Sequence, residues 1–139
     1  RLTRDPLPVR LAISLHAADD ETRSELMPIN VRYPIANLLA ACRRYRDTTG
    51  RRVFIEYLLL DGVNDDPIDA RRLAALLRDG DFHVNLIEYN PTSGPYRASP
   101  PERRERFAEA LAAEGLRPSI RHSRGADIAA ACGQLAGGD

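Results

Sequence analysis

The chain has 139 residues, 43% of them hydrophobic and 29% charged, and its 20 basic and 20 acidic residues give a formal net charge of zero. This length suits one domain with a modest core, and the balanced charge argues against a strongly basic nucleic-acid module. No apolar run reaches the roughly 18 residues of a membrane span and no signal-peptide pattern is present, so we expect a cytoplasmic protein. Two cysteines, Cys42 and Cys132, do not make a disulfide framework.

The amino-terminal elements predicted from the pattern are one strand and two helices. From Val9 to His16, large apolar residues alternate with small or polar ones, the period of two that is typical of a strand. Acidic residues at 19–21 suit the first turn of a helix that Pro28 stops. A further helix is predicted over 35–48, ending near Gly50, with an inward apolar face made of Ile35, Leu38, Leu39 and Cys42.

Strand and helix patterns continue to alternate after Gly50. Val53 to Leu60 is β-branched and aliphatic, as buried strands are, and Asp66-Pro67 is a cap and first turn for a helix to about Arg78. The remaining predicted elements are a strand over 84–89, a loop to residue 100, a helix over 101–114 closed by Gly115, and a strand over 117–122.

This alternation predicts an α/β fold built from right-handed βαβ units. The expected architecture is a parallel sheet of about four strands with flanking helices. Four strands do not close a barrel, so they suit half of one, with two exposed edges. An open doubly wound sheet is the alternative if the chain is complete.

Ser14 and His16 are predicted on the same face of the first strand, at its carboxyl end, where parallel α/β folds bind ligands. Leu11, Ile13 and Leu15 would pack against the helices. A hydrolytic pair of Ser14 and His16 is disfavoured, because no acid in this segment orients the imidazole. A ligand-binding face and an ordinary strand end both remain open.

Other polar residues are open to a functional or a structural interpretation. Asn90 precedes Pro91, which would aim an amide able to bind the amino acid part of a cofactor, although Asn-Pro is also ordinary turn chemistry. We interpret the carboxylates Glu56, Asp61 and Asp65 as structural. No metal-ligand spacing emerges from these acids or from the three histidines His16, His83 and His122.

Cys132 lies among small residues, with Gly133 behind it and Arg124-Gly125 ahead of it. Small neighbours let a ligand approach the sulfur closely, so a functional thiol and a small-residue helix end are both possible here. Cys42, on an apolar helix face, is predicted to be core. Two arginine groups would suit either phosphate binding or a solvated surface; they comprise Arg43, Arg44, Arg46, Arg51 and Arg52, and Arg117, Arg121 and Arg124.

Four segments in order, with Met27-Pro28-Ile29-Asn30 between the first two, resemble the dual-specificity ribosomal and transfer RNA adenine carbon-2 methyltransferases. This family is a branch of the radical S-adenosylmethionine enzymes. The four segments are 11–17, 54–65, 85–91 and 124–137. The resemblance implies the second half of a radical S-adenosylmethionine (β/α) barrel, in which residues 1–139 form a partial core domain and 112–139 its methyl-carrier cysteine segment.

The resemblance also implies site residues and chemistry. Ser14, Leu15, His16 and Asn90 would bind S-adenosylmethionine, and Cys132 would carry a methyl group. In the family, the matching cysteine is methylated by one S-adenosylmethionine, and a radical made from a second one at a [4Fe–4S] cluster activates that methyl group for transfer to adenine carbon 2. The implied substrates are 23S rRNA and tRNA, the implied electron donor is a flavodoxin-type protein, and the implied enzyme is a cytoplasmic monomer.

The chain departs from the family pattern in three ways. Glu88 stands where relatives commonly carry proline, and the cluster-binding Cys-x3-Cys-x2-Cys run and a resolving cysteine are absent from the printed sequence. We therefore expect a carboxyl-terminal fragment that is inactive by itself. Two alternatives stay open: a non-catalytic α/β nucleotide- or RNA-binding module, whose RNA affinity would fall with salt and ignore Cys132→Ala, or a single-cysteine thiol redox protein.

Overall fold

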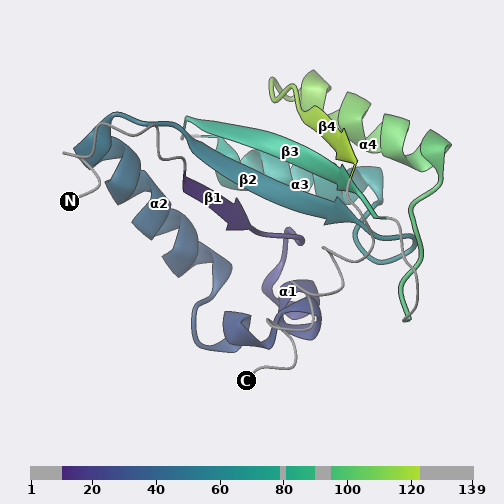
Figure 1. The fold of residues 1–139 in the computed structure, drawn as a ribbon, viewed down its shortest axis with the longest axis horizontal. Helices are drawn as coiled ribbons and strands as arrows, with labels where there is room; N and C mark the ends of the chain where they lie inside the picture. Colours follow the sequence, from purple (N-terminus) through teal and green to yellow (C-terminus); the bar gives the residue numbers. More distant parts are fainter. Residues whose placement is uncertain (1–10, 79–80, 90–94, 123–139) are drawn as a thin grey trace.

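A computed structural model describes residues 11–78, 81–89 and 95–122. Its centre is a sheet of four parallel strands in the order β1-β2-β3-β4 (Figure 1). The strands are β1 (Leu11–Ser14), β2 (Val53–Leu59), β3 (Phe82–Glu88) and β4 (Ser119–His122). The predicted α/β fold with a four-stranded parallel sheet is therefore confirmed, and β1 and β4 are the edge strands of this sheet.

The helices connect successive strands, as βαβ units require. They are α1 (Asp20–Leu26), α2 (Ile35–Thr49), α3 (Pro67–Leu77) and α4 (Pro101–Ala113), with a short 3₁₀ turn, η2 (Pro28–Val31), between α1 and α2. Each predicted helix is confirmed, and Pro28 stops α1 as expected. The η2 turn was not predicted, because a single turn of four residues has no periodicity to detect.

Local capping explains where these helices begin and end. The Asp19 carboxylate accepts a hydrogen bond from the backbone N–H of Thr22 at 2.7 Å and so caps α1. Asp66 and Asp69 form a reciprocal capping box at the start of α3. Gly50 ends α2 with a φ of 72°, a left-handed conformation that glycine adopts without strain.

The two faces of the sheet differ in what covers them. One face packs against α2, α3 and α4 in a single apolar core that includes Ile55, Tyr57, Leu73, Val84 and Phe107. In Figure 1, α3 lies behind the sheet, and none of the described helices crosses in front of β2 and β3. The face in front carries alternate residues of each strand, and we call it the open face.

The described helices contain no stretch that is both long and apolar enough to span a membrane.

Candidate functional site

The segment Ser14-Leu15-His16 leaves the sheet at the carboxyl end of β1. The strand ends at Ser14, two residues before the predicted end, although the Leu15 N–H still donates to the Glu56 carbonyl at 2.9 Å. Leu15 is fully buried against the helices, as expected, together with the partly buried Leu11 and Ile13. His16 has a φ of 61°, so strand alternation does not extend to it and the predicted shared face with Ser14 is wrong.

His16 is held by hydrogen bonds to its neighbour strand. Its Nδ1 atom accepts from the Leu58 N–H at 2.9 Å, and its carbonyl accepts from the Asn64 side chain at 2.8 Å. Burial, aided by the charge of Arg23, lowers the pKa of the imidazole from 6.5 to about 4. The ring is therefore neutral at physiological pH and its acceptor nitrogen is already in use, which agrees with the argument against a hydrolytic pair with Ser14.

Asn64 joins the carboxyl ends of β1 and β2. Its amide nitrogen donates to the carbonyls of His16 and Leu58, and its amide oxygen accepts from the Leu60 N–H at 2.8 Å. The Tyr57 hydroxyl donates to the Asn64 carbonyl at 2.7 Å. With 1% of its surface exposed, Asn64 has a structural role: it links the ends of the two strands. Sequence reasoning missed it, and its only signal was a polar amide directly after a buried strand.

Arg23 fixes the backbone of the same segment from the other side. Its guanidinium donates to the carbonyls of Leu15 and Ser14, each at 3.0 Å, and to the Asn30 side-chain oxygen at 2.9 Å. Burial lowers the pKa of this guanidinium below its ordinary value, and the charge of Asp20 opposes that effect. Arg23 is only 4% exposed. The backbone of the segment after β1 is therefore fixed by a buried arginine, and the sequence analysis did not predict this role for Arg23.

A cavity of about 330 Å³ opens beside the free edge of β1. Its lining includes Ser14 and Arg23 and is otherwise apolar, with Ala12, Ile13, Met27, Ile29, Tyr33 and Leu38. Among the described residues, none forms a hydrogen bond with the Ser14 hydroxyl, although the Ser14 carbonyl is bound by Arg23. Ser14 thus lines the cavity with a hydroxyl that no described residue binds, on a backbone that Arg23 holds in place.

A second polar cluster ties the turn after β2 to the segment before α4. The Asp65 carboxylate, 1% exposed, accepts from the Gly62 N–H at 3.0 Å and from the Ser99 hydroxyl at 2.6 Å. The Arg103 guanidinium lies 3.7 Å from it. The structural interpretation of Asp65 is confirmed. No group of three potential metal ligands occurs within residues 11–78, 81–89 and 95–122.

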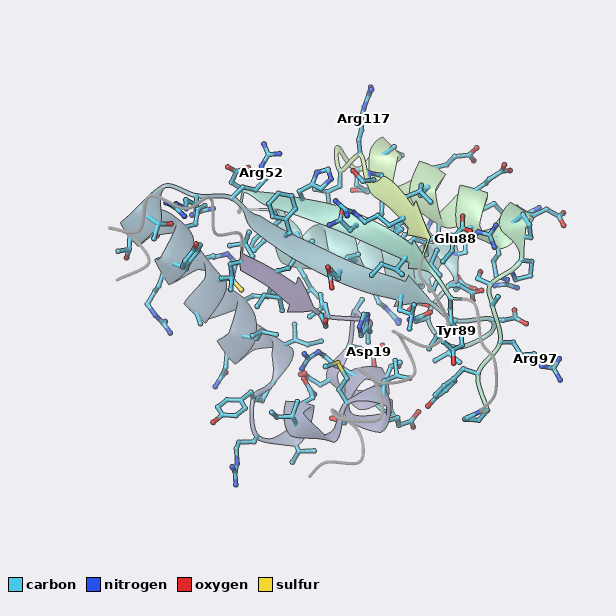
Figure 2. All side chains as sticks on the ribbon, in the orientation of Figure 1. Asp19, Arg52, Glu88, Tyr89, Arg97 and Arg117 are labelled. Carbon is cyan, nitrogen blue, oxygen red and sulfur yellow. The ribbon has the colours of Figure 1, made fainter. Side chains whose placement is uncertain are left out.

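Glu88 ends β3 and is bound to the helix side of the sheet. Its carboxylate lies 3.3 Å from Nε of Arg104 in α4. Figure 2 shows Glu88 and Arg52 at opposite ends of the sheet, since Arg52 directly precedes β2. The residue that departs from the family pattern thus has a charge partner of its own. Asn90, two residues further on, lies outside the described residues.

Of the two cysteines, the structure describes only Cys42. Cys42 is buried in the core on α2, as predicted, and burial raises the pKa of its thiol. Cys132 lies outside the described residues, as does Arg124.

Most arginines of the first group have partners within the protein. The Arg43 guanidinium donates to the Leu76 carbonyl at 2.8 Å and lies 5.9 Å from the ring centre of Phe82. Arg46 pairs with Asp47 and Arg52 pairs with Asp81. These contacts favour the interpretation of this group as structure and surface over a phosphate site.

Over almost its whole length the chain is similar to part of several RNA methyltransferases. It is 56% identical over 137 residues to a probable dual-specificity RNA methyltransferase RlmN of Parafrankia sp. (strain EAN1pec), covering 98% of this chain and 36% of that protein. It is 57% identical over 130 residues to the dual-specificity RNA methyltransferase RlmN of Anaeromyxobacter sp. (strain Fw109-5), covering 93% of this chain and 34% of that protein.

The fold is similar to that of a solved methyltransferase structure. The crystal structure of a radical SAM methyltransferase from Sphaerobacter thermophilus matches with a TM-score of 0.84 at 53% identity, covering 97% of this chain and 40% of that one. No family model matches the chain. The chain spans about a third of the length of the curated relatives described above.

Proposed function

Because the chain belongs to the family of dual-specificity RNA methyltransferases, we propose that it is the part of such an enzyme that binds S-adenosylmethionine and carries the methyl group on Cys132. In this proposal residues 1–139 are a portion of the radical S-adenosylmethionine core domain, and 112–139 are its methyl-carrier segment. The acceptor is carbon 2 of adenine in 23S rRNA and tRNA. The complete enzyme acts in the cytoplasm as a monomer that receives electrons from a flavodoxin-type protein.

The observation that carries the proposal is the Ser14 hydroxyl, which has no hydrogen-bond partner among the described residues and lies on a fixed backbone beside a cavity. A hydroxyl both donates and accepts, which suits the ribose and amino acid groups of S-adenosylmethionine. The proposed cofactor site comprises Ser14, Leu15, His16 and Asn90. Leu15 and His16 serve it by holding the segment, since their carbonyls are bound by Arg23 and Asn64. When bound, S-adenosylmethionine supplies an activated methyl group.

The residues of this chain do not fit an iron–sulfur cluster. Such a cluster needs three closely spaced cysteines, and the sequence has two cysteines ninety positions apart. Cys42, one of the two, is buried in the helix-covered core. We therefore assign no part of the cluster to this chain, and the cluster belongs to another portion of the proposed enzyme.

A methyl-carrying thiol needs room to move and an ionisable sulfur. The small residues around Cys132 give the first property, and the thiolate is the form that would attack a methyl group. Cys42 has neither property, because it is enclosed by the core and burial raises the pKa of its thiol. Its burial also argues against a redox protein that would pair the two cysteines.

Peptide mass spectrometry of the intact protein from its native cells tests the proposal. We expect one added methyl group on the Cys132 peptide, and none on the Cys42 peptide, which is the internal control. Cells carrying Cys132→Ala should lose 2-methyladenosine from both 23S rRNA and tRNA. Normal 2-methyladenosine in those cells, or an unmodified Cys132 in active protein, would contradict the proposal.

A further inference from the structure

A polar row crosses the open face of the sheet at one level. The strand register pairs Ser14 with Glu56, Glu56 with Asn85, and Asn85 with Ser119. Residues paired in this way point to the same side of a parallel sheet, and this side is opposite to the helix-covered core. Four strands thus contribute one polar side chain each to a continuous row, which we call the polar row.

Three members of the polar row lack hydrogen-bond partners among the described residues. Neither the Glu56 carboxylate nor the Ser14 hydroxyl has a polar contact there, and the Asn85 side-chain oxygen is fully covered without a partner. Asn85 is only 4% exposed. A covered amide oxygen without a partner destabilises the fold. Ser119 differs, because its hydroxyl lies 2.7 Å from Nε2 of His83.

Unsatisfied polar groups are unusual in this protein. Asn30, Asn64 and Asp65, which are equally buried, each make at least two hydrogen bonds. Among the described residues the buried side-chain atoms without a partner are Nε of Arg43, the Tyr45 hydroxyl and Oδ1 of Asn85, and of these only Oδ1 of Asn85 lies in the polar row, on the face opposite the helix-covered core. A ligand that donates hydrogen bonds would satisfy Glu56 and Asn85, since a carboxylate and an amide oxygen both accept.

The rows on either side of the polar row are aromatic or apolar in β2 and β3, and the row on the carboxyl side ends at Arg121 in β4. Towards the amino ends of the strands, Phe54 and His83 make an edge-to-face contact with ring centres 5.6 Å apart. Towards the carboxyl ends, Leu58 and Ile87 form an apolar cluster with Tyr89. The polar row itself contains a carboxylate and no cation, which disfavours a phosphate as its direct ligand, and Arg121 lies in the adjoining row, paired with Ile87.

We propose that Glu56 and Asn85, together with Ser14, bind an adenosine group lying along the polar row. The ribose hydroxyls would donate to Glu56 and Ser14, and the exocyclic amine of the base would donate to Asn85. The oxygen of an asparagine amide accepts a hydrogen bond from the exocyclic amine of adenine. Carboxylates similarly accept from ribose hydroxyls in nucleotide sites. The inference rests on the proposed function, in which the methyl donor and the target base both contain adenosine.

The dimensions of the polar row agree with this ligand. Ser14 and Asn85 are two strands apart, which separates them by about 9–10 Å at two interstrand spacings. A nucleoside has a similar length from its ribose hydroxyls to its exocyclic amine. A half turn of the Asn85 side-chain amide would exchange the positions of its oxygen and nitrogen and so turn the acceptor oxygen toward the base.

Nucleoside analogues test this proposal without altering the chain. Isotope-labelled chain titrated with adenosine should show NMR shifts at the Asn85 side-chain amide and at the backbone amides of Glu56 and Asn85. Inosine, in which oxygen replaces the amine, loses one hydrogen bond in the row and should bind about tenfold more weakly. Dideoxyadenosine, which lacks both ribose hydroxyls, loses two and should bind at least about tenfold more weakly. Equal affinity for all three nucleosides, or no shift in the row, would overturn the proposal.

Variants assign the two contacts. In Glu56→Gln, adenosine should bind about tenfold more weakly while dideoxyadenosine binds as it does to the unaltered chain. In Asn85→Ala, the preference for adenosine over inosine should disappear. Glu109→Gln and Asn37→Ala, at exposed positions of α4 and α2, are the matched controls and should leave all affinities unchanged. Unaltered nucleoside preferences in Glu56→Gln and Asn85→Ala would overturn the assignment.

The same titration separates the two sources of adenosine. S-adenosylhomocysteine and a short adenine-containing RNA are added in turn as competitors, and the one that displaces adenosine identifies whether the row serves the methyl donor or the target nucleotide. Competition by neither would overturn the inference. Failure of the proposed function would appear differently, as an unmodified Cys132 in the native protein, with no effect on nucleoside binding to the row.

Discussion

The Nδ1 atom of His16 accepts a hydrogen bond from the backbone N–H of Leu58 at 2.9 Å, which joins the loop after β1 to the end of β2. A histidine side chain here substitutes for a backbone carbonyl in the parallel ladder. The bond needs the neutral ring, and the low pKa of His16 ensures it. The imidazole is thus a structural acceptor whose protonation state is coupled to the shape of the proposed cofactor segment.

Stability should therefore fall with acid in a defined window. Unfolded His16 gains its proton as pH falls below 6.5, whereas the folded ring does so only near pH 4. The unfolded state binds more protons between these values, so the contribution of His16 is complete above pH 6.5 and is lost as pH falls towards about 4. The loss amounts to about 3 kcal/mol of the free energy of unfolding.

Denaturant titrations across this pH range, on the unaltered chain and on His16→Asn, measure the effect. Asparagine tolerates the left-handed backbone but does not titrate, so the variant should lose less stability on acidification. His83, whose pKa is also lowered by burial, contributes equally to both proteins and cancels in the difference. Identical pH dependence in the two proteins would contradict the assignment.

Replacing Arg23 by methionine should lower the free energy of unfolding by about 3 kcal/mol. The substitution leaves the carbonyls of Ser14 and Leu15 and the Asn30 side-chain oxygen without their buried donor. Arg32→Met, at an exposed position, is the matched control and should change stability by less than about 0.5 kcal/mol. Urea denaturation of both variants checks this. Equal stabilities would show that the Arg23 contacts are energetically neutral.

Asp65 and Ser99 should prove strongly coupled. Each single change, Asp65→Asn or Ser99→Ala, disrupts a buried hydrogen bond of 2.6 Å and should destabilise the protein by about 1–3 kcal/mol. In a double-mutant cycle the combined loss should be smaller than the sum of the two, by about 1–2 kcal/mol, because both changes remove the same contact. Additive losses would show that the two side chains act independently.

Cys42 should resist alkylation in the folded protein. Its thiol is 2% exposed, and burial raises its pKa, so both access and thiolate formation are suppressed. The Cys132→Ser variant leaves Cys42 as the only thiol. We expect iodoacetamide to label this variant only after denaturant is added, with intact-mass spectrometry as the readout. Rapid labelling of the native variant would contradict the burial of Cys42.

Most helices and strands could be predicted from the local sequence pattern. The contacts that hold the segment 14–16 in place could not. The helix starts at Asp19 and Asp66 and the helix end at Gly50 were predicted because the responsible side chains act on backbone only a few residues away. The roles of Arg23 and Asn64 were not predicted, because their partners are main-chain atoms of distant residues, which leave no trace in composition or spacing.

The carboxylates also include one residue whose role could be predicted from the sequence and one whose surroundings could not. Asp65 is structural, as its place in a turn indicated, and its partner Ser99 is 34 positions away. Glu56 was grouped with it as structural, but no described residue binds its carboxylate. The difference comes from strand register, which places Glu56 beside Ser14 and Asn85 and which sequence alone does not give.

The turn after β2 also has a consequence for the order in which the chain assembles. Asn64 bonds to His16, 48 residues earlier, and the adjacent Asp65 bonds to Ser99, 34 residues later. One bond needs an earlier segment to dock and the other a later segment, so we expect the turn to be completed late on the folding pathway. Interactions absent from the transition state slow unfolding without speeding folding. We therefore expect Asn64 and Asp65 to affect the unfolding rate of the native protein more than its folding rate.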